Sequence, residues 1–212
     1  SKTAQYTAQA ASQMNRVLQA AKQANIKKLI YTSSLSTIGL PPRREDRLAD
    51  ERAFYQKGSL PDNGSYESKI VQEELALTAH REGLFVVILN PTAVFGPGDV
   101  HLGTGQILQR VARGSVKAVP SGTLNIIDVR DLAEAHLNAA RTGKSGERYI
   151  LGGENYSIFD AITRFASFLN VPPPRYTLPS WSLDVYLALS RVFPFLPEAP
   201  FHLQAHRYWQ GY

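Results

Sequence analysis

A tyrosine and a lysine stand three residues apart in GSYESKIVQEE, residues 64–74, as Tyr66 and Lys69. A phenol with a pKa near 10 is a poor base at neutral pH unless a nearby cation stabilises its anion. A lysine ammonium can supply that charge, so the pair indicates proton transfer to or from a substrate oxygen. The same residues are equally compatible with the polar start of a surface helix, with Ser65 as its N-cap and Lys69 in solvent.

Polar segments follow two apolar runs of the chain. The run KKLIYTSS, residues 27–34, ends in hydroxyl side chains, and LFVVILNPTAVFG, residues 84–96, runs into a Pro/Gly loop. Both runs have the length and composition of buried strands. Ligands of parallel sheets bind at the carboxyl ends of the strands. The segments TSS and NPTAVFGPG are therefore the candidate ligand-binding segments.

Helical and strand patterns alternate along the rest of the chain. Helices are expected over about 4–24, 66–82, 104–114, 131–141 and 156–170, and further strands over 124–129 and 147–153. Asp131 is placed to cap the helix over 131–141, and Asp128 is likewise expected to cap or position a helix and not to act as an acid or base. The alternation predicts the α/β class, with a doubly wound parallel sheet. The chain begins in a helix, so we expect this sheet to lack its first strands.

Composition excludes several classes of function. With 212 residues and 43% apolar residues, the chain can build one large domain or one domain with a small lobe. The net charge of +5 is spread over pairs such as Lys27–Lys28 and not along a stripe, which argues against nucleic acid as a partner. The absence of cysteine excludes disulfides and thiolate catalysis. No apolar run suits a membrane span and no signal peptide opens the chain, which predicts a cytoplasmic protein.

Five blocks of sequence, in this order, carry a family resemblance: YTSSLSTIG, the Tyr/Lys helix, VVILNPTAVFGPGD, NIIDVRDLAEAHL and GERYILGGEN. Together they resemble the extended short-chain dehydrogenase/reductase family. Within it they are most similar to the NAD-dependent epimerase/dehydratase group, especially hopanoid-associated sugar epimerases and dihydroflavonol-reductase-like proteins. The likeness spans about residues 10–165. It implies a Rossmann-like fold, NAD or NADP as cofactor, a small-molecule substrate, and pairing of two copies through the Tyr66/Lys69 helix.

The resemblance also implies roles for individual residues. Ser34 would hydrogen-bond the substrate oxygen, Tyr66 would be the catalytic acid/base, and Lys69 would contact the nicotinamide ribose and lower the pKa of the tyrosine. The residues implied to border the cofactor, besides Tyr66 and Lys69, are Thr32, Ser33, Pro91, Thr92, Ala93 and Val94. Those implied to meet the substrate are Ser34, Ser36, Asn90, Phe95 and Arg130. No metal site is implied.

The expected domain organisation also follows from the resemblance. Residues 1–155 would be the C-terminal part of a Rossmann-like dinucleotide-binding domain, with substrate-lobe insertions over about 97–125. Residues 156–212 would form an incomplete substrate-binding lobe. The implied reaction is the oxidation or reduction of a carbinol or carbonyl centre, with a nucleotide sugar as one candidate substrate.

Two features of the chain depart from the family pattern. The family spaces its tyrosine and lysine four residues apart, whereas here the spacing is three. The glycine-rich motif that places a pyrophosphate at a helix N-terminus is also absent, since GTGQIL at 103–108 has no strand before it and no third glycine. Either the chain is a fragment, or the missing part is supplied elsewhere. Two alternatives therefore stay open: a carbonyl reductase of the dihydroflavonol-reductase type, and a non-catalytic binding or scaffold subunit.

Two other groups of polar residues are better interpreted as structural or surface residues than as functional sites. His202 and His206 are four residues apart and could clamp a metal, but no third ligand is evident, so we expect packing or surface roles. Glu73 and Glu74, one after the other in the Tyr/Lys helix, are expected to form a solvated helix face.

Overall fold

A computed structural model describes residues 2–39, 49–55, 57–58, 63–179, 181–182 and 185 of the chain. These residues belong to two compact units. The first contains the chain up to Thr92 together with Ile127–Gly152. The second contains Ala93–Ile126 and the chain from Gly153 onward. His202, His206 and most of the predicted lobe after residue 179 lie outside the described residues, so the expectation for them stays a prediction.

The first unit is built on a parallel sheet of three strands in the order β1–β2–β6. The strands are β1 (Leu29–Thr32), β2 (Val86–Pro91) and β6 (Arg148–Leu151). The register places Thr32 opposite Leu89, and Pro91 opposite Leu151. The carboxyl ends of all three strands therefore meet at one edge of the sheet.

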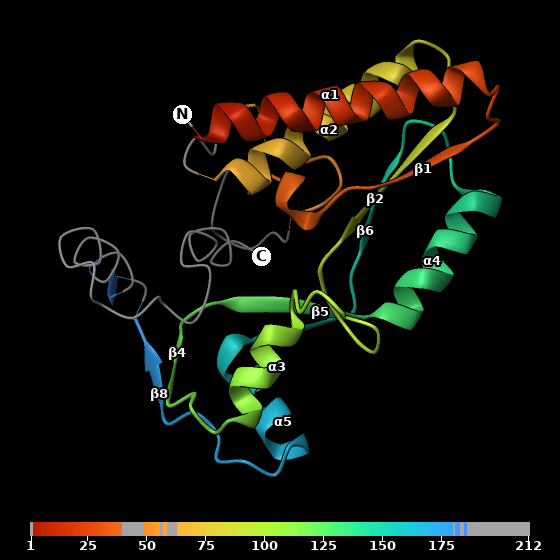
Figure 1. Ribbon diagram of the computed structural model, residues 1–212. Coiled ribbons are helices and arrows are strands. Elements are labelled where there is room, and N and C mark those ends of the chain that lie inside the picture. Colours follow the sequence, from red (N-terminus) through yellow and green to blue (C-terminus); the bar gives the residue numbers. More distant parts are fainter. Residues whose placement is uncertain are drawn as a thin grey trace. The chain divides into compact units, whose positions relative to one another are not determined.

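Helices cover both faces of this sheet, which confirms the predicted doubly wound α/β fold. On one face, α1 (Lys2–Gln23) packs against α2 (Gly64–Arg81), and both contribute to an apolar cluster with Val86 and Ile88. On the other face, Val87 and Leu89 pack with Ala139 of α4 (Val129–Thr142). Side chains alternate between the faces of a strand, which explains why β2 is buried along its whole length. Figure 1 shows α1 and α2 on one side of the strands and α4 on the other.

The starts of α2 and α4 differ from the sequence expectations by a few residues. Asn63 caps α2, because its Oδ1 accepts a hydrogen bond from the Tyr66 amide at 3.2 Å. Ser65 already lies in the first helical turn, so its prediction as the cap is wrong. Asp128 caps α4 by accepting from the Arg130 amide at 2.8 Å. The prediction of Asp131 as that cap is wrong for the same reason, since the helix begins before it.

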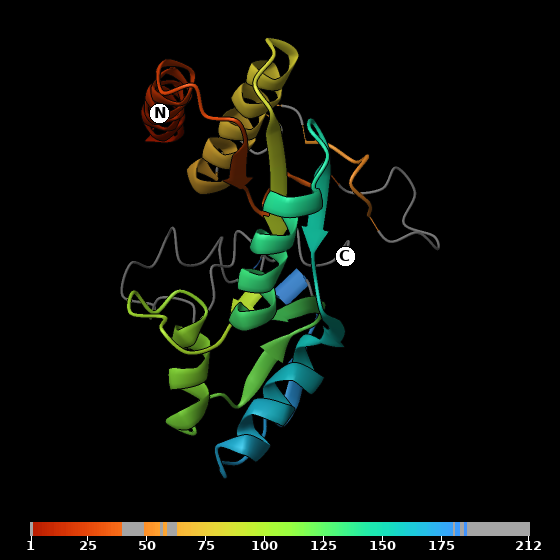
Figure 2. The ribbon, with the colours of Figure 1, turned by 90° about the vertical axis from the view of Figure 1, so that its right-hand side faces the viewer.

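In the second unit, the described residues form two small sheets and two helices. The strands β3 (Ala93–Phe95), β5 (Thr123–Asp128) and β7 (Glu154–Ser157) form one sheet. The strands β4 (Ala118–Pro120) and β8 (Tyr176–Leu178) pair in parallel as the other. The helices are α3 (Gly105–Ala112) and α5 (Ile158–Phe168), which Figure 2 shows in green and blue. Val111, Val119 and Ile162 belong to the core of this unit.

The segment predicted as one strand over 84–96 is two strands in the structure. β2 ends at Pro91 and β3 begins at Ala93, and they belong to different sheets. Continuous apolar character cannot reveal such a break, because both halves are apolar. None of the described helices combines the length and the apolar character needed to cross a bilayer.

Candidate active site

The end of β1 passes directly into a hydroxyl-rich turn. Ser34 is the N-cap of a short 3-10 helix, Leu35–Thr37, and its Oγ accepts a hydrogen bond from the Ser36 amide at 3.2 Å. Ser33 is buried and its hydroxyl donates inward to Glu73, whereas Ser34 is only half-buried. Of these two hydroxyls, the one at Ser34 is therefore the more accessible to a ligand.

Asn90 joins this turn to the neighbouring strand. Its side chain is fully buried, and its Nδ2 donates to the Ser34 carbonyl at 3.2 Å. This contact follows from the register, because β1 and β2 end side by side. The structure thus brings together Ser34 and Asn90, which the sequence placed after two different strands.

Lys69 points from α2 toward the same edge. Its Nζ donates to the Thr32 carbonyl at 3.3 Å and lies 5.7 Å from the centre of the Tyr31 ring. Burial lowers the pKa of Lys69, and the negative charge of Glu73 partly offsets that effect. Lys69 as a whole is half-buried and its Nζ contacts the Thr32 carbonyl, in contrast to the alternative interpretation of a lysine in solvent.

The burial of Ile70 limits where a lysine can stand in this helix. Ile70, four residues after Tyr66, is 2% exposed and belongs to the buried face of α2. A lysine at position 70 would place its charge in that core, so Lys69 holds the position from which an ammonium can reach the strand ends. Ser65 stands four residues before Lys69, and it is exposed. With Lys69 in the predicted role, the departure from the four-residue spacing lies at the tyrosine.

Tyr66 nonetheless lies on the same side of α2 as Lys69. At about 100° per residue, Tyr66 and Ser65 lie about 60° and about 40° from Lys69, on opposite sides of it. Tyr66 is half-buried in the first turn of the helix. The helix therefore permits a phenol at either position to approach the lysine.

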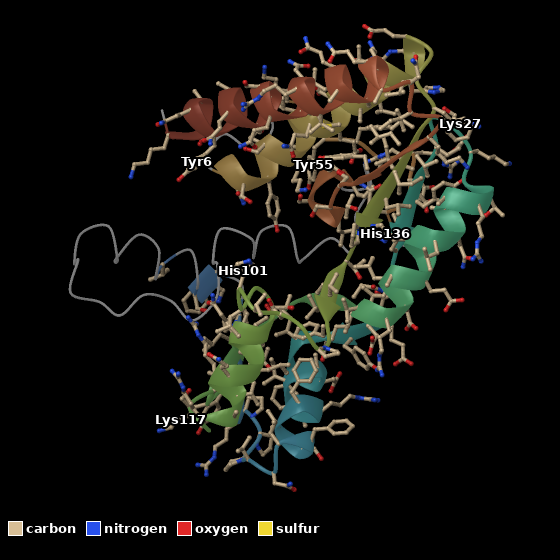
Figure 3. All side chains as sticks on the ribbon, turned by 45° about the vertical axis from the view of Figure 1, so that its right-hand side comes forward. Tyr6, Lys27, Tyr55, His101, Lys117 and His136 are labelled. Atoms are coloured by element: carbon tan, nitrogen blue, oxygen red, sulfur yellow. The ribbon has the colours of Figure 1, made fainter. Side chains whose placement is uncertain are left out.

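A histidine supports the end of β1 from the other face of the sheet. Thr32 Oγ1 lies 2.8 Å from Nε2 of His136, and the Nδ1 of that ring lies 2.8 Å from the Leu132 carbonyl. Because a carbonyl only accepts, Nδ1 carries the proton in the neutral ring, and Nε2 accepts from Thr32. Figure 3 shows His136 on α4 next to the strands. This contact is compatible with the predicted cofactor-side role of Thr32, which stays a prediction.

The other predicted site residues are distributed over both units. Pro91 and Thr92 end the first of the two segments that form the first unit, and the Thr92 amide donates to the Leu151 carbonyl at 3.0 Å. Ala93, Val94 and Phe95 form β3 of the second unit, where Phe95 packs on Phe165 with ring centres 5.1 Å apart. The substrate-side residue Ser36 is buried.

Arg130 makes a different contact from the one predicted for it. Its guanidinium is largely exposed and pairs with Asp128, with Nη2 and Oδ2 2.7 Å apart. This pair lowers the pKa of Asp128 to about 2. Arg130 thus supports the cap of α4, and its predicted contact with substrate stays a prediction.

A buried polar cluster lies next to the turn that contains Ser34, and the sequence did not predict it. It consists of Ser33, Thr37, Glu73, Asn90 and Arg148. Glu73 is 3% exposed, so the prediction that it belongs to a solvated face is wrong, although Glu74 is exposed as expected. The available signal was the helical period, which puts Glu73 on one face with Ile70 and Ala76.

Part of this edge has the chemistry to hold the nicotinamide half of a dinucleotide. Asn90 Oδ1 and Thr92 Oγ1, at this edge, are among the buried side-chain atoms of the described residues that have no hydrogen-bond partner. An ammonium has three donors, and the Lys69 group directs one of them at Thr32. Ribose hydroxyls and a carboxamide need such donors and acceptors, so the residues present fit this group.

Comparisons relate this chain to known proteins. Residues 1–152 match the model of the NAD dependent epimerase/dehydratase family. A dihydroflavonol 4-reductase-like protein of Synechocystis sp. is 38% identical over 171 residues, covering 78% of this chain and 49% of that protein. Sterol demethylase protein B of Methylococcus capsulatus is 27% identical over 164 residues, covering 77% of this chain and 49% of that protein. The chain thus spans about half the length of the curated relatives it matches.

The fold has a similar solved structure. A nucleoside-diphosphate-sugar epimerase from Pseudomonas aeruginosa superposes with a TM-score of 0.81 at 28% identity. The match covers 89% of this chain and 61% of that one.

Proposed function

Because the chain belongs to the NAD dependent epimerase/dehydratase family, we propose that it takes part in the NAD(P)-dependent oxidation or reduction of a carbinol or carbonyl centre. Membership confirms the resemblance drawn from the five sequence blocks. The observation that carries the proposal is the half-buried Lys69, whose ammonium donates to the Thr32 carbonyl at the end of β1. The neighbouring strand end holds Asn90 against the carbonyl of Ser34.

The proposed roles follow from this geometry. Lys69 and Thr92 hold the nicotinamide ribose and carboxamide, and the bound nicotinamide supplies or accepts the hydride. The Ser34 hydroxyl hydrogen-bonds the substrate oxygen. Tyr66 exchanges a proton with that oxygen, and the nearby Lys69 charge favours the phenolate form.

Two substrate classes are compatible with this reaction. One relative is a dihydroflavonol 4-reductase-like protein, and one structural neighbour is a nucleoside-diphosphate-sugar epimerase. We therefore infer either a simple ketone or a nucleotide sugar as the substrate. Product analysis with one compound of each class separates them. Pairing of two copies through α2 and a cytoplasmic location remain predictions.

The test of the mechanism is Tyr66→Phe in the protein as its gene encodes it. Turnover, followed through the nicotinamide absorbance, is expected to fall by at least about 10²-fold, because the variant cannot transfer the proton. Tyr6→Phe is the matched control, since Tyr6 is an exposed phenol of α1 (Figure 3) with no proposed role. Unchanged turnover in Tyr66→Phe would end the assignment of Tyr66.

A non-catalytic role is the second candidate, and one specific observation favours it. Ser65, and not a tyrosine, stands four residues before Lys69. If this displacement abolishes proton transfer, the wild-type protein binds NAD(P) but turns over neither substrate class. Equilibrium binding of the dinucleotide combined with the turnover assay separates this candidate from the first.

A further inference from the structure

Both oxygens of the buried Glu73 carboxylate have polar partners. It projects from the inner face of α2, and its Oε1 lies 2.7 Å from Nε of Arg148. Its Oε2 accepts from the hydroxyl of Ser33, from Thr37 Oγ1 at 2.7 Å and from Asn90 Nδ2 at 2.8 Å. A single side chain of α2 thus connects the turn after β1 with the end of β2 and the start of β6.

Arg148 extends the same buried polar cluster to a separate segment. Its Nη1 donates to the carbonyls of Glu51 and Ala53 at 2.8 and 2.7 Å. Its guanidinium also lies over the ring of Phe54, 4.0 Å from the ring centre. The Glu51 carboxylate in turn accepts from the Ile150 amide at 3.0 Å. Segment 49–55 is therefore held to β6 through Arg148.

An ion pair buried this deeply is not explained by stability alone. Removing two charges from water is costly, and apolar residues of similar volume often stabilise a fold at least as well. The cluster instead holds polar groups in defined positions, since Oε2 of Glu73 accepts hydrogen bonds from three side chains at once. Its contacts converge on Ser33, Thr37 and Asn90, which flank or hold Ser34.

We propose that Glu73 is a positioning residue of the candidate active site. It fixes the turn that presents the Ser34 hydroxyl, and it places a negative charge one helical turn from the Lys69 ammonium. This inference rests on the proposed function of Ser34 and Lys69. Glu73 itself touches neither substrate nor cofactor, and acts through Ser33, Thr37, Asn90 and Lys69.

The charges around Glu73 give the proposal an electrostatic consequence. Burial lowers the pKa of Lys69, while Glu73 acts in the opposite direction. Burial also raises the pKa of the Tyr31 phenol from β1, and Glu73 raises it further. The other charged groups that face the cluster are Arg148 from β6 and Glu51 from segment 49–55. Removing the charge of Glu73 should therefore lower the pKa of Lys69 further.

The central experiment measures the Lys69 titration directly in the full chain, without cofactor or substrate. Lysines are dimethylated with a ¹³C label, and the Lys69 signal is assigned through its loss in Lys69→Arg. Glu73→Gln keeps the shape of the side chain and removes its charge, so the Lys69 midpoint is expected to move to lower pH. Glu74→Gln, one residue along the same helix but exposed, is the matched control and is expected to leave the midpoint in place.

A second variant separates charge from position. Glu73→Asp keeps the charge but withdraws the carboxylate by one methylene, so the Lys69 midpoint is retained while the turn loosens. Amide hydrogen exchange at Ser34 and Thr37 is then expected to accelerate in both Glu73→Asp and Glu73→Gln. If Glu73→Gln fails to fold because Arg148 is left unpaired, the neutral pair Glu73→Gln/Arg148→Gln replaces it. An unmoved Lys69 midpoint together with unchanged exchange at Ser34 in the folded variant would overturn the proposal.

Activity measurements distinguish this inference from the proposed function. Glu73→Gln is expected to lower kcat by about 10²-fold, since small displacements of reacting groups cost that much. The alkaline limb of its pH profile should move to lower pH together with the Lys69 midpoint. If Tyr66→Phe retains full turnover while the Lys69 midpoint still depends on Glu73, the proton-donor role fails and the positioning role stands. If Tyr66→Phe is inactive, but the Glu73→Gln variant has the wild-type Lys69 midpoint and the wild-type turnover, only the positioning role fails.

Discussion

At the scale of single residues, the burial of Ile70 fixes where the lysine of the pair can stand. Lys69 reaches the carbonyl of Thr32, and no charged side chain fits the core position after it. A phenol, in contrast, has two adjacent positions from which it can approach the ammonium, Ser65 and Tyr66. The chemistry therefore depends on which of these two positions carries the ring.

Because a tyrosine at either position can approach Lys69, we predict the effect of moving the tyrosine from position 66 to position 65. The double variant Ser65→Tyr/Tyr66→Phe restores the four-residue spacing, and position 65 is exposed, so it accepts a larger side chain without a cost in packing. We expect its turnover to lie within about tenfold of the wild type, whereas Tyr66→Phe alone loses at least about 10²-fold. Steady-state kinetics of the three proteins provide the comparison. A double variant as inactive as Tyr66→Phe would show that a tyrosine at position 65 cannot transfer the proton.

The residue-level predictions succeed and fail for identifiable reasons. Ser34 and Asn90 come together because each follows a strand, and parallel strands end at a common edge. Glu73 was misplaced because glutamate is almost always exposed unless it is paired. Its partner Arg148 belongs to a strand far along the chain. No local pattern links the two residues, so only the fold reveals the pair.

At the scale of elements, the cap of α2 holds the helix that carries both Tyr66 and Lys69. Asn63 accepts from the Tyr66 amide, one of the backbone donors that a helix start leaves unsatisfied. Asn63→Ala is expected to lower the free energy of unfolding by about 1 kcal/mol. Chemical denaturation measures this loss.

Ser65→Ala is the matched control for the cap. Ser65 is exposed and already helical, so its replacement by the best helix former should not lower the free energy of unfolding. A larger loss in Ser65→Ala than in Asn63→Ala would mean that the helix begins later than the structure places it.

The elements themselves were largely predictable, and their ends were not. The helical and strand periods indicated α1, α2, α3, α4 and α5 as well as β1, β5 and β6. The break between β2 and β3 at Thr92 was not visible, because the apolar character continues across it. Helix starts were misplaced by a few residues because several polar residues near each start can act as a cap.

At the scale of the whole molecule, each of the two compact units has a hydrophobic core of its own. Ile88 belongs to the core between the sheet and the helices α1 and α2. Ile162 of α5 belongs to the core of the second unit. Both side chains are at most 2% exposed, which makes them matched probes of the two cores.

The separate cores predict separate responses to cavity-forming substitutions. Ile88→Ala and Ile162→Ala should each lower the free energy of unfolding by about 2–5 kcal/mol, because each leaves a cavity in a packed core. Amide hydrogen exchange reports which elements lose stability, because local unfolding occurs in cooperative units. Ile88→Ala is expected to accelerate exchange mainly in β1, β2 and β6, and Ile162→Ala mainly in α5 and β4. Equal acceleration throughout the described residues by either substitution would mean that the two units unfold as one, and that the order around the Ser34 turn depends on the core of the second unit.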